Sequence, residues 1–354
     1  MAGRLHHTVP RFLMKGFASR TSENNVFVWM YRKNTPAREV NILKIGVEKD
    51  FYGKVTEANV DDQITEIEPA YSDLLADLRL RPISCRLDDE RIPSLITHLT
   101  FRTRFLRQSM LDTLSILIDS VHSNLRDEET LRKMIWQDPR IQHLLRTELA
   151  GRGVEESHME KAIALLEPHF PKVVELVPEC SQLIDELVRK ASSEIPRAIR
   201  AAHITALTKL PDEDARAESY AKLNWFIVLV KSPLFLGDTA CIYETTGQRW
   251  FTPIHETRDA LAKVLLPVAH DRLIVGTPLS TCPTIDALSI NKAVTRCSYE
   301  YFIGPVQLQP ESSLLKSIGR WSGILGDSDV DKISAELKTS LVTPKRSARD
   351  PKVE

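Results

Sequence analysis

The spacing of the apolar residues changes along this chain, and that change limits the folds open to it. Residues 25–50 contain the run NVFVWMYRK, where apolar and polar residues nearly alternate as in a half-buried strand. Helical spacing holds from about 57 to 232, strand-like runs return at 234–276, and an amphipathic helix is predicted at 283–303. This order predicts an α+β, predominantly helical protein: a helical bundle packed beside a small sheet built from N-terminal and C-terminal strands.

The chain shows no internal repeat and no low-complexity block, so a single compact domain is expected over residues 1–339. Within it, residues 25–50 are expected to form a hairpin. The last segment, 340–354, is polar and combines proline with mixed charge, which predicts a disordered tail.

Three stretches carry the clearest helical patterns. The first places six apolar side chains on one face: Ile64, Ile67, Tyr71, Leu74, Leu75 and Leu78. Pro69 lies inside that pattern, so this helix either begins near the proline or kinks there. A long helix is predicted from about 92 to 125, and RAESYAKLNWFIVLV at 216–230 is predicted to be helical and mostly buried.

Charge and motifs narrow the functional classes. A net charge of −1 provides no global field for nucleic acid or an anionic membrane, although a local basic groove is compatible with it. No apolar run reaches the roughly 18 residues that span a bilayer, and the N-terminus does not read as a signal peptide. The sequence lacks the motifs of P-loop NTPases, Rossmann dehydrogenases, zincins and ordinary serine hydrolases. Five scattered cysteines, none at CxxC spacing, predict reduced thiols in a cytoplasmic protein.

The opening, MAGRLHHTVPRFLMKGFASR, is organised from about residue 5. His7 stands just before Val9-Pro10, where the proline favours extended backbone and so fixes the direction of the imidazole. A neutral histidine there can serve as a general acid, a general base or a ligand. Alternatively, it hydrogen-bonds a backbone carbonyl and holds the N-terminal arm to the body. In an extended segment His6 alternates with His7 and is expected to face solvent.

Helical phase distinguishes the two glutamates of the first helix. Glu66 points away from the apolar face, whereas Glu68 lies about 80° from the centre of that face, half-buried and in need of a partner. Arg102 occupies a similar edge of the helix at 92–125, and Arg107 lies near the opposite edge. A Glu68–Arg102 ion pair is the simpler interpretation. The other is an arginine that holds a phosphate or carboxylate, with Glu68 as acid or base.

Asp238 follows the apolar run LFLG, at the point where a predicted strand meets a turn. Two interpretations remain open: the carboxylate projects into a cleft, or it forms an Asx-turn that caps the backbone N–H of Ala240. His255 and His270 lie in loops beside the same strands and are expected to be solvated.

Several of these stretches together resemble a bacterial family called domain of unknown function 4238. Its entry motif is similar to HTVPRFL at 7–13 followed by Gly16-Phe17. The likeness continues through Trp29, Phe51-Tyr52, ITEIEPAYSDLLADL with Glu68, TFRTRFLRQ, NWFIVLVKSPLFLGDTA, LLPVAHDRLIVG and SINKAVTRCSYEYFIG, which holds Asn291. It covers about residues 5–305. The family pattern usually reads Ser-Asp-x-Pro where this chain has Gly-Asp-Thr-Ala at 237–240. The resemblance implies a shared fold, and it brings no established activity.

The candidate site residues fall into two groups: His7, Glu68 and Asp238 for catalysis, and Arg102, Arg107 and Asn291 for anion binding. Such a set suits a hydrolase acting on a phosphate-bearing substrate, a nucleotide or nucleic acid, with or without a divalent metal. A toxin-like or phage-defence effector would fit a bacterial family of this kind. The alternative is a non-enzymatic binding or scaffold protein with a protein partner, in which the polar cluster is a structural network.

Overall fold

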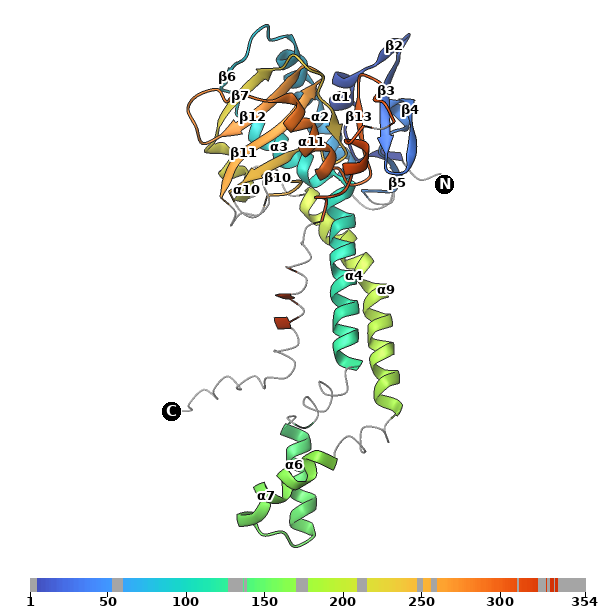
Figure 1. Cartoon of the computed structure of the whole chain (residues 1–354), viewed down its shortest axis with the longest axis vertical. Helices are drawn as coiled ribbons and strands as arrows, with labels where there is room; N and C mark the ends of the chain where they lie inside the picture. The colour runs from blue at the N-terminus through green and yellow to red at the C-terminus, as the bar shows by residue number, and fades with distance from the viewer. Residues whose placement is uncertain are drawn as a thin grey trace. The chain divides into compact units, whose positions relative to one another are not determined.

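Strand β3 (Asn25–Arg32) organises the first sheet, because its alternating residues bury Val28 and Met30 against the core. In the computed structural model (Figure 1), β3 pairs on one edge with β4 and on the other with β2 and β13, and β8 lies beyond β13. All these pairs are antiparallel. The partner strands are β2 (Arg20–Ser22), β4 (Thr35–Asn41), β8 (Leu236–Gly237) and β13 (Tyr301–Gly304). The expected hairpin and the sheet shared by early and late strands are both confirmed.

The described part of the chain comprises residues 5–52, 60–126, 136, 139–169, 178–208, 215–246, 251–255, 260–310, 312–323 and isolated positions between 329 and 336. The chain divides into two compact units, residues 1–110 with 199–324 and residues 111–198 with 325–354. Each unit is described by itself. The sequence-based expectation was one domain over 1–339, and the segment 340–354 lies outside the described residues.

A second, six-stranded antiparallel sheet of the first unit has the order β10-β9-β11-β12-β7-β6. Its long central strands β11 and β12 form a hairpin at His270 and Asp271, and their side chains are almost wholly buried. The strands are β6 (Cys85–Leu87), β7 (Asn224–Leu229), β9 (Ile242–Thr245), β10 (Phe251–Thr252), β11 (Leu261–Ala269) and β12 (Arg272–Thr277).

The helices of the first unit pack around one main apolar core and two smaller apolar clusters, which the end of α9 and the start of α4 contact. They are α1 (Arg11–Met14), α2 (Val60–Leu80), α3 (Arg91–Arg102), the start of α4 (Arg104–Arg126), the end of α9 (Pro178–Thr208), α10 (Ala215–Ala221) and α11 (Ala287–Cys297). Short 3₁₀ turns cover Lys15–Phe17, Ile42–Lys44 and Leu315–Ser317. The apolar face predicted for α2 is confirmed, and Pro69 lies inside this helix.

Strand β1 (Leu5–His7) pairs with β5 (Val47–Lys49) and ties the N-terminal arm to the body. The backbone N–H of Thr8 donates to the carbonyl of Gly46 over 2.7 Å. Gly46 has a φ of +60°, and a Cβ there would lie 2.6 Å from the Tyr301 hydroxyl. The close approach of the arm therefore requires glycine at this position.

The structure corrects three sequence-based boundaries. The helix expected at 92–125 is interrupted at Thr103, whose backbone is extended, so Arg102 ends α3 and Arg107 belongs to α4. Residues 224–229, expected to be helical, form β7, and residues 301–304, expected to close a helix, form β13. The α+β class is confirmed, but the described residues hold three antiparallel sheets, more strand pairing than the small sheet expected.

The second unit is helical within the residues described. Helices α6 (Pro139–Gly151) and α7 (Glu156–Leu166) contact one another, and Arg146 forms ion pairs with Glu156 and Glu160. A short 3₁₀ turn, Glu167–His169, follows α7. None of the helices in the described ranges is both long and apolar enough to cross a membrane.

Candidate functional site

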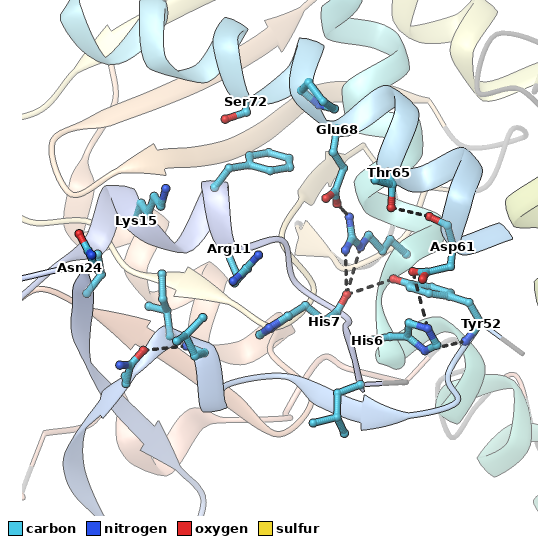
Figure 2. Close-up of a pocket in the computed structure, with 18 residues that line it drawn as sticks. His6, His7, Arg11, Lys15, Asn24, Tyr52, Asp61, Thr65, Glu68 and Ser72 are labelled. Atoms are coloured by element: carbon cyan, nitrogen blue, oxygen red, sulfur yellow. Dashed lines mark hydrogen bonds and ion pairs between the residues drawn. The ribbon is translucent and has the colours of Figure 1, made fainter. Parts of the chain in front are cut away.

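A large cavity of about 540 Å³ lies in the first unit, where β1, α1, α2 and the end of β4 meet. Its wall combines apolar and charged side chains from segments that are distant in the sequence (Figure 2). The polar ones are His6, His7, Arg11, Lys15, Asn24, Asn41, Tyr52, Asp61, Thr65, Glu68, Ser72 and Arg102. Three predicted site residues therefore meet here: His7, Glu68 and Arg102.

His7 is held by its position at the end of β1. Its Nδ1 lies 3.1 Å from the carbonyl oxygen of Ile45, and because a carbonyl only accepts, Nδ1 carries the proton. In the neutral ring Nε2 is then an acceptor. Burial lowers the pKa of His7 below 6.5, and the nearby charges of Arg11 and Arg102 act in the same direction, against the hydrogen bond to Ile45. The imidazole at the cavity is therefore neutral at pH 7.

Arg102 links Glu68 to the backbone of His7. Its Nε and Nη2 donate to the His7 carbonyl oxygen over 3.1 and 3.0 Å, and its Nη1 forms an ion pair with Glu68. The predicted Glu68–Arg102 pair is confirmed. The guanidinium is only 5% exposed and its donors point at protein atoms, so the contacts show it positioning His7.

Asp238 lies elsewhere, beside a smaller cavity of about 80 Å³ that Thr8 and Tyr301 also line. Its carboxylate accepts the backbone N–H groups of Tyr299, Glu300 and Tyr301 over 2.7, 2.6 and 3.1 Å. Burial nevertheless raises its pKa to about 6, against the effect of these hydrogen bonds. The structure does not bring Asp238 together with His7.

Of the two interpretations of Asp238, the Asx-turn is wrong. The N–H of Ala240 donates to the carbonyl of Gly237 over 3.0 Å, while the Asp238 side chain turns toward the start of β13. The carboxylate, just after β8, therefore binds the backbone where the chain enters β13 instead of capping its own turn.

Arg107 and Asn291 also lie outside the large cavity. Arg107 donates to the Phe51 carbonyl over 2.6 Å and contacts Nδ1 of His203 at 3.0 Å. Burial lowers its pKa to about 10. Asn291 accepts the N–H of Phe235 over 3.0 Å and donates to the Pro233 carbonyl over 2.8 Å. Both side chains thus have structural contacts on protein backbone.

Two histidines, His6 and His255, were expected to face solvent, and this expectation is wrong because both are buried. His6 is 5% exposed; its Nε2 lies 3.6 Å from Asp61 and its ring centroid 5.0 Å from that of Tyr52. His255 is 2% exposed and stacks on Tyr243. The pleat of β1 does alternate, but it turns His6 inward because α2 covers that side. His270 is exposed, as expected.

Arg11 and Lys15 are cavity residues that the sequence analysis did not single out. Both are exposed, and neither has an ion-pair partner within the described ranges. They lie four residues apart on the short helical segment after Pro10, so they share one face. That i, i+4 pair of cations in RFLMK is the sequence signal that could have identified them.

No group of three or more His, Cys, Asp or Glu side chains suited to a metal ion occurs in the described part of the chain. The cysteines described there, Cys85, Cys241, Cys282 and Cys297, are free thiols.

Residues 5–296 match the model of a family described as protein of unknown function (DUF4238). Neither the curated proteins nor the solved structures compared with the chain give a match. Since the match covers most of the sequence, the chain belongs to the DUF4238 family.

Proposed function

We propose that this member of the DUF4238 family is a hydrolase that binds a phosphate ester in the cavity between β1, α1 and α2. The observation that carries the proposal is the neutral His7 imidazole at the cavity wall, with Nδ1 fixed by Ile45 and with the cations Arg11 and Lys15 beside it. A fixed neutral histidine next to an anion-binding pair is the arrangement that general-base attack on a phosphate ester requires.

The chemistry follows from the side chains in the cavity. Arg11 and Lys15 bind the phosphate oxygens by charge-assisted hydrogen bonds and offset the charge that gathers on them as the ester reacts. His7 Nε2 accepts a proton from a water molecule, whose oxygen forms a bond to phosphorus. The ester P–O bond breaks, and the leaving alkoxide takes a proton from a solvent water. The His7 imidazolium then returns the proton it accepted to the solvent, which restores the neutral ring. Arg102 holds the His7 carbonyl and so keeps the ring in place.

The experiment compares hydrolysis of a panel of phosphate monoesters and diesters, with and without Mg²⁺, by wild type, His7→Gln and His270→Gln. His270 is an exposed histidine of the same unit and does not line the cavity, so it is the matched control. We expect His7→Gln to stay folded at the assay temperature and to lose about a hundredfold or more in rate, while His270→Gln keeps the wild-type rate and melting midpoint. Equal rates for His7→Gln and wild type would refute the role of the histidine.

A non-enzymatic scaffold is the second candidate, and the Arg102 contacts favour it. Because Arg102 joins Glu68 to the backbone of His7, the cluster can serve solely to fasten the N-terminal arm. A scaffold predicts that wild type hydrolyses no member of the panel.

A further inference from the structure

The charges around the large cavity are separated into two ends. Figure 2 shows Lys15 toward one side and Asp61 and Glu68 toward the other, with Arg11 between them. The first end carries the two cations Arg11 and Lys15. The second carries the carboxylates of Asp61 and Glu68. Glu68 is paired with the guanidinium of Arg102, and Asp61 lies 3.6 Å from Nε2 of His6.

A hydroxyl group adds to the second end. Thr65 lies on α2 between Asp61 and Glu68, one helical turn from each, and lines the cavity. The Thr65 hydroxyl donates to the Asp61 carbonyl over 2.7 Å, which leaves its lone pairs as acceptors. This end is therefore rich in acceptors and has net negative charge.

We propose that the ligand of this cavity is a small phosphomonoester whose other end carries amino or hydroxyl donors. The inference rests on the function proposed above and names its substrate class. The phosphate lies at Arg11 and Lys15, and the donors face Asp61 and Thr65. A cavity of about 540 Å³ is of the size that holds small molecules.

The same separation disfavours polyphosphates and polynucleotides. A ligand with further phosphates would place negative charge against Asp61 and Glu68, where like charges at short range oppose binding. A phosphomonoester with an ammonium or hydroxyl tail instead gains attraction at both ends. The charge pattern thus favours phosphomonoesters with a donor-bearing tail over polyphosphates and polynucleotides.

Calorimetric titration tests the inference with three probes: phosphoethanolamine, inorganic phosphate and ATP. We expect phosphoethanolamine to bind about tenfold more tightly than inorganic phosphate, because of the added charge-assisted hydrogen bonds at the second end, and more tightly than ATP. Tighter binding of ATP would overturn the inference while leaving hydrolysis through His7 intact. Failure of all three probes to bind would overturn the proposed function as well.

Variants assign the two ends. Asp61→Asn should remove most of the preference for phosphoethanolamine over inorganic phosphate, and Asp73→Asn, an exposed control on the same helix, should keep it. Lys15→Gln should weaken the binding of both phosphoethanolamine and inorganic phosphate about tenfold. Arg38→Gln, at an exposed position of β4, is the control and should bind both as the wild type does. Thr65→Val provides a second test of the second end should Asp61→Asn melt early. An unchanged preference in a folded second-end variant contradicts the inference.

Discussion

Replacing Arg102 with methionine should destabilise the protein by about 3 kcal/mol. Methionine preserves the buried volume but removes two charge-assisted hydrogen bonds to the His7 carbonyl, worth about 1.5–3 kcal/mol. It also leaves the Glu68 carboxylate unpaired. Breaking a fully buried ion pair costs about 3–5 kcal/mol. The Glu68 side chain is 27% exposed, so water solvates the unpaired carboxylate and its cost is well below that range.

Urea denaturation measures this loss. With an m value of about 3 kcal/mol/M, the midpoint should fall by about 1 M, and amide exchange should show reduced protection in β1 because its anchor is gone. Arg104→Met is the matched control: Arg104 pairs with Glu300 and Glu48 but is 48% exposed, so its loss should cost under about 1 kcal/mol. Equal costs for the two variants would refute the anchoring role of Arg102.

Three further predictions follow from the described contacts. The fold raises the pKa of Asp238 from 3.8 to about 6, so the stabilisation from this group is full below pH 3.8. About 3 kcal/mol of it is lost as the pH rises through 6. Asp238→Asn should remove this loss when urea denaturation is compared at pH 4 and pH 7, and a variant with the wild-type pH dependence would contradict the prediction. Gly46→Ala forces a Cβ toward Tyr301 at a φ of +60° and should cost about 3 kcal/mol, whereas Gly151→Ala, with open space around it, should keep the wild-type melting midpoint. Because burial lowers the pKa of His7 below 6.5, kcat/KM for the phosphate ester should be level at alkaline pH and fall with an inflection below pH 6.5. An inflection above pH 7 would exclude His7 as the base.

The helix periodicity carried the most reliable sequence information. The apolar face of α2 follows from its 3.6-residue spacing, and the same phase placed Glu68 at the edge where Arg102 meets it. The run NWFIVL was misassigned because a short, continuous apolar stretch suits a buried strand as well as a buried helix. Its place between β12 and β6 decides in favour of a strand, and that placement depends on segments distant in the sequence.

The site was only partly predictable from the sequence, because its contacts also join segments that are distant along the chain. Arg102 reaches a main-chain carbonyl 95 residues away, and no pattern of side chains encodes a backbone acceptor. Asp238 and Asn291 likewise satisfy backbone groups, which is the commonest fate of buried polar side chains. Arg11 and Lys15 were within reach of sequence reasoning, since cations four residues apart share a helical face.

The most direct test of the account is an NMR titration of the His7 imidazole with and without phosphoethanolamine. In the free protein the account predicts a pKa below 6.5 with the proton on Nδ1. A phosphate held by Arg11 and Lys15 should raise that pKa, because a nearby anion favours the imidazolium, and Lys15→Gln should reduce the rise. A His7 pKa that saturating ligand leaves unchanged would contradict the claim that this cavity is the site of a phosphate ester.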